Sequence, residues 1–125
     1  MAFRTALRRF EQWSLRQFAK AGVTVQQDYL MVAVCAHPAG GPSIRELAEQ
    51  LVLRHHTVVE LVDRAEGAGL VRRCHDASDR RVVRIQLTEA GRSLVDRLEA
   101  THRDQLEQIT PAMAMIYKSL DEPMR

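Results

Sequence analysis

The sequence predicts a mainly α-helical domain that carries one small β-hairpin. Three observations support this fold class. Apolar residues recur at close to helical spacing over most of the chain. Two short helical patterns near the middle are joined by a turn of about three residues. Directly after them come two β-rich runs of six residues separated by a polar stretch, which is typical of a hairpin.

Length and composition indicate one globular domain. The 125 residues suffice for a single hydrophobic core but not for two. Hydrophobic residues make up 46% of the chain, and no apolar run approaches the roughly 18 residues of a membrane span. The first residues lack an uninterrupted apolar core followed by a small-residue cleavage site. We therefore expect one folding unit, a cytoplasmic location and no membrane association.

Two helices are predicted at the N-terminus. The first is amphipathic and spans residues 3–21, with Trp13 beside its apolar stripe and Gly22 after its end. The second begins at Thr24, because Gln27 three residues later gives the spacing of a capping box. It is apolar nearly all round, so we expect it at the centre of the domain. The stretch HPAGGP ends it.

Two further helices form a helix-turn-helix pattern. Ser43 and Glu46 repeat the capping-box spacing and open a helix of about two turns. After a turn of about three residues, a second helix runs from about Arg54 to Ala68, and Gly69 terminates it. Each helix has one apolar stripe. The second helix is therefore the candidate for reading a nucleic acid.

The predicted hairpin lies directly after the helix-turn-helix pattern. Residues 70–75 and 82–87 form its strands, and DASDRR forms its polar tip. A hairpin in this position is a wing. Thr88 is the candidate N-cap for a last helix that runs to about Gln108. Pro111 is expected to start a short apolar tail.

Basic side chains concentrate in the hairpin. The net charge of the whole chain is only +2, which by itself argues neither for nor against nucleic acid. Between residues 72 and 84, however, the sequence has five arginines and only two aspartates, a local excess of +3 charges. The arginines are Arg72, Arg73, Arg80, Arg81 and Arg84, and the aspartates are Asp76 and Asp79.

The sequence contains no pattern typical of a metal site, a cofactor site or a catalytic centre. Cys35 and Cys74 have no metal-like spacing, so two reduced thiols are the simpler interpretation. Cys35 lies in an apolar run where a thiol tends to stay inert, which makes Cys74 the more reactive candidate. The adjacent His55 and His56 do not share a helix face. We therefore expect no metal, no cofactor and no enzyme activity.

Four stretches together resemble the MarR family of bacterial winged-helix transcription regulators. They are RELAEQL, TVVELVDRAEGAGLVRR, DASDRRVVRIQLTEAG and the helix that follows. The similarity is close from Ser43 to about Leu98, and the flanking helices agree in kind and order. Its specific part is the D-x-x-D-R-R hairpin tip followed by a strand and LTEAG.

The resemblance implies a winged helix-turn-helix protein in which the N- and C-terminal helices of two chains pack together. Residues 1–38 and 88–125 would form this dimerisation scaffold, and residues 42–87 would bind DNA. The expected function is sequence-specific binding to a pseudo-palindromic operator, as a repressor that a small aromatic or anionic effector releases. The apolar terminal helices agree, since a monomer would expose a large apolar surface.

The start of the helix from Arg54 is predicted to contact DNA. Its side chains point away from the apolar stripe, and in helix-turn-helix proteins this turn meets base edges in the major groove. A solvated helix end is the alternative interpretation. The candidates on this helix are Arg54, His55, His56, Thr57, Glu60 and Arg64.

Three positions depart from the family's usual pattern. Val52 stands where the turn usually has glycine, and Arg54 stands where the reading helix usually has a small N-cap. Glu60 occupies a position where a basic or polar contact residue is common. Phosphates would repel its carboxylate, so Glu60 either accepts from a cytosine amino group or pairs with an arginine, and we favour Arg64.

By resemblance, one of the two arginines at the hairpin tip, Arg80 or Arg81, reaches the minor groove. Asp79, or Asp63 on the reading helix, would hold the other by a charge-assisted hydrogen bond. A solvated turn is the alternative. The remaining arginines are expected to bind phosphates, which positions the protein without reading sequence. They are Arg72, Arg73 and Arg84.

The resemblance also implies an effector cleft between the dimer helices and the reading domain. Core packing explains most of the candidate residues equally well. They are Trp13, Tyr29, Met31 and His37.

A second functional class is a winged-helix protein-interaction module whose arginine-rich hairpin docks on an acidic partner. Changing Arg54 and His55 to alanine would distinguish the two classes. It should abolish DNA binding but leave such docking intact.

Overall fold

The computed structural model of the protein describes residues 2–38 and 40–121, and beyond residue 105 it describes the side chain of residue 107 alone. Within this part of the chain, five helices and one two-stranded sheet confirm the predicted fold class. The elements are α1 (Ala2–Ala21), α2 (Val25–Ala36), α3 (Ile44–Leu51), α4 (His55–Gly67), β1 (Val71–His75), β2 (Val83–Leu87) and α5 (Glu89–Asp121).

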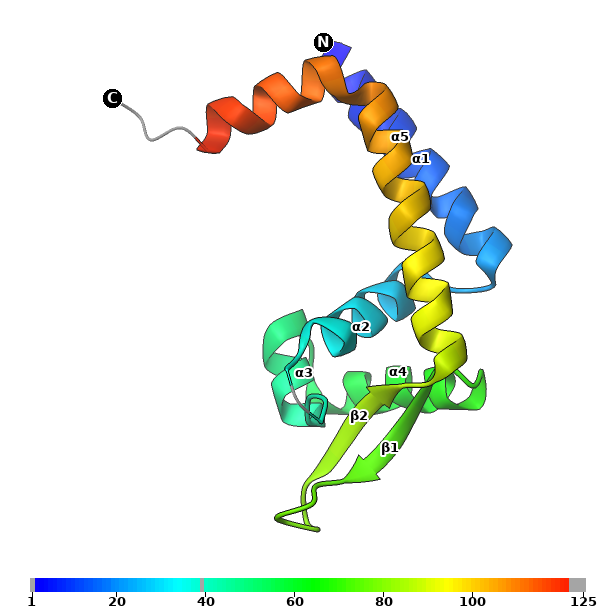
Figure 1. Cartoon of the computed structure of the whole chain (residues 1–125), viewed down its shortest axis with the longest axis vertical. Coiled ribbons are helices and arrows are strands. Elements are labelled where there is room, and N and C mark those ends of the chain that lie inside the picture. The colour runs from blue at the N-terminus through cyan, green and yellow to red at the C-terminus, as the bar shows by residue number, and fades with distance from the viewer. Residues whose placement is uncertain (1, 39, 122–125) are drawn as a thin grey trace.

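The elements separate into a helical arm and a reading end (Figure 1). The long helix α5 rises from the hairpin and runs beside α1, and these two helices form the arm. Helices α2, α3 and α4 pack together below it and, with the hairpin β1–β2, form the reading end. The hairpin β1–β2 projects from the end opposite the N-terminus. The reading end therefore lies far from the start of α1.

Both predicted capping boxes are present. The backbone N–H of Gln27 donates to Thr24 Oγ1 at 3.1 Å, and the Thr24 N–H donates to the Gln27 side chain at 2.9 Å. Ser43 and Glu46 exchange the same pair of bonds, each at 3.2 Å. Each box satisfies two backbone donors that a helix start would otherwise leave unpaired. These bonds fix where α2 and α3 begin.

Three helices end at a residue in the left-handed conformation. Gly22 follows α1 with φ +76°, and Gly69 follows α4 with φ +74°. Val52 takes the same role after α3 with φ 56°, and it is the one non-glycine residue with positive φ among those described. The next N–H then bonds five residues back, Val23 to Phe18 at 3.0 Å, Leu53 to Ala48 at 3.0 Å and Leu70 to Ala65 at 2.9 Å. The turn that directs α4 is thus built on a strained valine.

The hairpin is attached to the helix-turn-helix through its second strand. The strands pair antiparallel, from Val71 opposite Leu87 to His75 opposite Val83. The N–H of Ile85 donates to the Pro42 carbonyl at 2.8 Å, which joins β2 to the segment before α3. The hairpin therefore does not hang from α4 alone.

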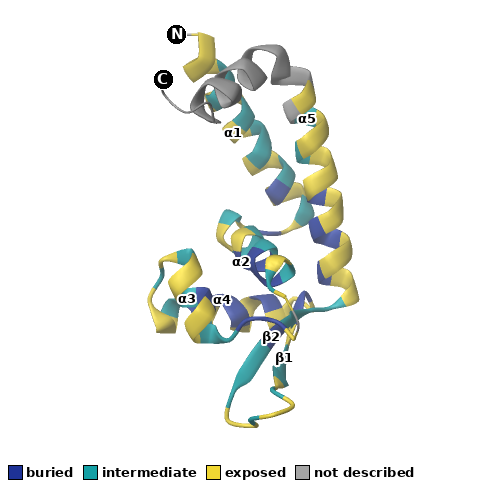
Figure 2. Ribbon diagram, turned by 60° about the vertical axis from the view of Figure 1, so that its left-hand side comes forward, coloured by how far each residue is buried: buried dark blue, intermediate teal, exposed yellow. Residues whose placement is uncertain are grey.

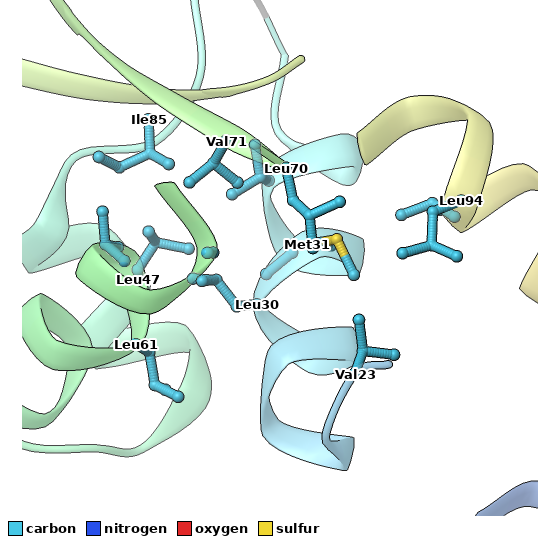
Figure 3. Close-up of a cluster of buried hydrophobic side chains, with 14 of the residues drawn as sticks. Val23, Leu30, Met31, Leu47, Leu61, Leu70, Val71, Ile85 and Leu94 are labelled. Carbon is cyan, nitrogen blue, oxygen red and sulfur yellow. The ribbon is translucent and has the colours of Figure 1, made fainter. Parts of the chain in front are cut away.

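One hydrophobic core lies between α2, α3, α4 and the hairpin, and it extends to α1 and α5 (Figure 3). Leu30 and Met31 of α2 are 0% exposed, as are Leu47 of α3 and Ile85 of β2. The predicted central position of α2 is confirmed. Removing such a buried side chain costs about 2–5 kcal/mol, so this core holds the reading helix in place.

The C-terminal helix is longer than predicted. We expected it to end near Gln108 and Pro111 to start a tail, but α5 continues to Asp121. An interior proline removes one backbone hydrogen bond and its ring crowds the carbonyl four residues back, which kinks or ends most helices. The local signal at Pro111 therefore favoured an end that the structure does not show. Residues 122–125 of the predicted scaffold segment lie outside the described residues.

Candidate nucleic-acid interface

The outer face of α4 presents polar side chains to solvent. Its inner face is held by four buried residues of the apolar stripe. Arg54 is the N-cap, yet its side chain makes no capping bond, so its guanidinium is free to reach outward. Figure 2 shows exposed residues along this helix. The predicted contact residues Arg54, His55, His56, Glu60 and Arg64 are exposed, and Thr57 is half-buried.

The predicted pair between Glu60 and Arg64 does not form. Among the described residues, no ion pair or side-chain hydrogen bond involves either group. The spacing of four residues permits the contact, but at an exposed site it stabilises a helix by only about 0.3–0.5 kcal/mol. Both charges are therefore available to an external partner.

Two aspartates shape the tip of the hairpin. Asp76 Oδ2 accepts from the N–H groups of Ser78 and Asp79, each at 2.9 Å. The Asp79 carboxylate accepts from Arg81 Nε at 3.0 Å and from Arg81 Nη2 at 3.2 Å. This side-chain bond from Arg81 lowers the pKa of Asp79. Asp79 thus orients Arg81, the contact that the resemblance implied.

Arg80 is the free arginine of the tip. It is exposed, and among the described residues its guanidinium has no hydrogen-bond or ion-pair partner. Its carbonyl oxygen accepts from His75 Nδ1 at 2.9 Å, which fixes the backbone at this point. A fixed backbone with an unpaired guanidinium suits insertion into a narrow groove.

Arg84 is a structural residue rather than a phosphate contact. Its Nε donates to Asp76 Oδ1 at 2.6 Å, and its Nη1 donates to the Gly41 carbonyl at 2.9 Å. Glu46 lies 3.8 Å from the same guanidinium. The bond from Arg84 also lowers the pKa of Asp76. The structure therefore argues against the predicted phosphate role, because two carboxylates already occupy this guanidinium.

Arg73 is likewise occupied. Its Nη2 donates to Asp63 at 2.7 Å, and its Nη1 donates to Glu66 at 2.6 Å, both on α4. The bond to Asp63 raises the pKa of Arg73, so the group stays charged. Asp63 therefore supports the wing through a strand arginine, not through Arg80 or Arg81. These bonds lock β1 to the reading helix and leave no free phosphate clamp at Arg73.

Arg72 keeps its charge uncompensated. Its guanidinium donates from Nε and Nη2 to Gln86 Oε1 at 3.3 and 3.0 Å, and this partner is neutral. The side chain stands on the face of the sheet opposite Arg73. An anion could therefore still bind Arg72, although not on the face that meets α4.

The four predicted effector residues do not share one cleft. Met31 is fully buried in the core, whereas Tyr29 is 59% exposed. Trp13 lines an open groove of about 820 Å³ along α1. His37 lies at the other end of α2, where its Nε2 contacts Glu46 at 2.8 Å. Tyr29 and Met31, two residues apart on α2, thus face different surroundings in the single chain, and an effector cleft between two chains stays a prediction.

An aromatic cluster that joins α1 to α5 was not predicted. His102 Nε2 lies 2.6 Å from Ser14 Oγ, and the ring stacks on Phe18 with centroids 5.2 Å apart. Phe10 and Trp13 flank the same ring. The two helices are 88 residues apart at this contact, so no local pattern in the sequence could have indicated it.

Neither a metal site, a membrane span nor a disulfide is found in the part of the chain that the structure describes. No group of three His, Cys, Asp or Glu side chains gathers there in a way that could hold a metal ion. None of the described helices is long and apolar enough to cross a membrane. Both cysteines are free thiols.

An exposed reading helix that is tied to an arginine-tipped hairpin defines a winged helix-turn-helix protein. The chain belongs to the MarR family, whose family model matches residues 21–82. Its relatives carry the names of transcription regulators, not of enzymes, in agreement with the expectation from the sequence.

One curated relative is the transcriptional repressor MdtR of Bacillus subtilis. The two sequences are 32% identical over 77 residues, which is 62% of this chain and 48% of MdtR. The match thus spans about half the length of that relative.

Two solved structures extend the similarity over nearly the whole chain. The S. aureus MepR–DNA complex is 27% identical with a TM-score of 0.63, covering 95% of this chain and 93% of MepR. CouR from Rhodococcus jostii RHA1, bound to p-coumaroyl-CoA, is 28% identical with a TM-score of 0.67, covering 95% and 91%.

Proposed function

We propose that this protein is a homodimeric, sequence-specific DNA-binding transcription regulator. Helix α4 enters the major groove and the hairpin tip enters the adjacent minor groove. The observation that carries the proposal is the distribution of free charge. Arg54, Arg64 and Arg80 are exposed and unpaired among the described residues, whereas Arg73 and Arg84 of the hairpin strands are bound to carboxylates.

The internal ion pairs support this use of the free arginines. Arg73 ties β1 to α4, and Arg84 ties the hairpin to the segment that precedes α3. Wing and reading helix are therefore held in one fixed relation. A rigid pair of elements lowers the entropic cost of ordering the backbone when DNA binds.

The descriptions of two relatives support a repressor role and a small-molecule effector. MdtR is a repressor, and CouR was crystallised with a small-molecule ligand. We infer that this protein also represses transcription from a pseudo-palindromic operator and that a small molecule releases it. The ligand would act by favouring a separation of the two reading helices that does not fit successive major grooves.

A fluorescence-anisotropy titration with the protein's own upstream DNA tests DNA binding. Affinity should fall steeply with salt, with a slope of about −0.9 in log–log units for each neutralised phosphate. Arg80→Ala should weaken binding about tenfold or more, while Arg97→Ala on the exposed side of α5 should leave it unchanged. Binding that is absent, or that does not respond to salt, would contradict the proposal.

The alternative is docking of the arginine-rich wing on an acidic partner. The double variant Arg54→Ala with His55→Ala discriminates, because these residues stand on α4 rather than on the wing. Loss of DNA binding in this variant supports base contact by the reading helix. DNA binding at wild-type strength would contradict base contact by the reading helix and favour the alternative, in which the arginine-rich wing docks on an acidic partner without the helix.

A further inference from the structure

A second, smaller cavity lies away from the reading face. It has a volume of about 340 Å³ and lies between the end of α2, the loop that follows, the outer face of the β-hairpin and the first turns of α5. Its polar lining includes Cys35, His37, Arg72, Gln86 and Arg92. The volume is at the small end of the roughly 300–1,000 Å³ that ligand sites occupy.

Two of the lining side chains carry uncompensated positive charge. Arg72 donates only to the neutral Gln86 amide. Arg92 has no hydrogen-bond or ion-pair partner for its guanidinium among the described residues. His37 is directed away, with Nδ1 on the Pro38 carbonyl at 2.7 Å and Nε2 on Glu46 at 2.8 Å. The described residues that line the cavity include no carboxylate.

This arrangement suits an oxyanion. A guanidinium presents a planar fork of N–H donors that matches carboxylate and phosphate oxygens, and such charge-assisted bonds are about twice as strong as neutral ones. The neighbouring hairpin arginines, Arg73 and Arg84, each bind carboxylates. Arg72 and Arg92 therefore differ from them in having donors left for a ligand.

We propose that this cavity binds a small molecule through a carboxylate or phosphate group held between Arg72 and Arg92. The ligand would bridge β1 to α5 and so join the wing to the arm. Binding of this ligand to the protein does not depend on whether the protein binds DNA. Any effect of the ligand on operator affinity would rest on the function proposed above.

Cys35 provides a reporter inside the cavity. In a Cys74→Ser background it is the only thiol of the chain, and serine can keep the bond that Cys74 donates to Gln86. The rate of its alkylation by N-ethylmaleimide is measured in sodium phosphate, sodium benzoate and sodium chloride at equal ionic strength. Saturable slowing by phosphate or by benzoate, but not by chloride, is expected, and the more effective anion identifies the chemical group.

Two matched variants locate the binding. Arg92→Gln should raise the apparent dissociation constant about tenfold or more, whereas Arg97→Gln, also on α5 but outside the cavity, should leave it unchanged. The increase in Tm with each anion is measured in parallel, so the result does not depend on thiol reactivity. Equal protection by chloride, or binding that survives Arg92→Gln, would overturn the proposal. So would protection of Cys35 by a DNA duplex alone, since the arginines would then hold backbone phosphates.

Discussion

Val52 holds a backbone conformation that glycine provides elsewhere in the molecule. Its φ of 56° places a β-branched residue in the left-handed region, and its side chain is 88% exposed, so packing gains little from it. Left-handed geometry costs an L-residue about 1–2 kcal/mol. The strain lies in the turn between α3 and α4, which sets the direction of the reading helix.

Val52→Gly should therefore stabilise the protein by about 1 kcal/mol, because relief of the strain exceeds the roughly 0.5–1 kcal/mol of backbone entropy that glycine costs. The measurement is the urea midpoint at an unchanged m-value. Gln50→Gly, an exposed change just before it within helix α3, should instead destabilise by about 1 kcal/mol. A loss of stability in Val52→Gly would show that the valine side chain contributes packing.

Arg84 and Asp76 form a pair whose contribution depends on pH. The bond from Arg84 lowers the pKa of Asp76 below its ordinary value of 3.8. A carboxylate with a lowered pKa stabilises the folded state above the ordinary pKa, and this stabilisation is lost as pH falls through the lowered one.

Arg84→Gln should consequently lower stability most above about pH 5, and the difference from wild type should shrink as the pH falls below about 4. Urea unfolding at several pH values measures this. Arg45→Gln, which removes an exposed pair with Glu49, should cost little at any pH. A difference for Arg84→Gln that stays constant with pH would mean that the bond to the Gly41 carbonyl dominates.

The sequence predicts the charge of the hairpin but not the partners of all its arginines. The sequence predicts a cluster of positive charge, and that cluster is present. It does not predict which arginines are neutralised, because the partners of Arg73 and Arg84 depend on strand register and on how the sheet packs against α4. Asp79 and Arg81, two residues apart, are close enough in sequence for their pairing to be anticipated.

At the level of elements, Gly91 explains the close approach of α5 to the hairpin. It is buried in the first turn of α5, and a Cβ at this position would lie 2.0 Å from the Leu70 carbonyl oxygen. That same oxygen accepts from the Thr88 N–H at 3.0 Å. The glycine of LTEAG is thus required where the arm meets the wing.

Gly91→Ala should destabilise the protein by about 1–3 kcal/mol, since backbone atoms must move to accommodate the methyl group. Gly67→Ala is the matched control, because Gly67 is also helical but has nothing within 4 Å of the point that an added Cβ would occupy. It should stabilise by up to about 1 kcal/mol. Thermal unfolding followed by circular dichroism measures both, and equal effects would contradict the packing argument.

Local elements were predicted well because their signals are local. The capping boxes at Thr24 and Ser43 and the glycine after α4 mark helix ends within a few residues. Two features could not be predicted in this way. The stacking of His102 on Phe18 depends on a neighbour that is distant in sequence. The continuation of α5 through Pro111 runs against the local signal of the proline.

At the scale of the whole molecule, the arm presents apolar surface that one chain does not cover. Leu15 on α1 is 47% exposed and Phe3 is 40% exposed, beside the open groove lined by Phe10 and Trp13. Figure 2 shows α1 and the described part of α5 exposed over much of their length. A second copy of the chain would bury such a surface, in agreement with the proposed dimer.

One substitution should separate formation of the proposed dimer from contact with DNA. The mass of the wild-type protein, measured by size-exclusion chromatography with light scattering, should be twice the 14.2 kDa of one chain. Leu15→Glu should shift the population toward monomer. Gln26→Glu adds the same charge on α2 and should not. Because two reading helices must meet major grooves about 34–36 Å apart, Leu15→Glu should weaken binding to a full operator far more than to a single half-site. A monomeric variant that binds the full operator as tightly as wild type would show that each chain reads DNA alone.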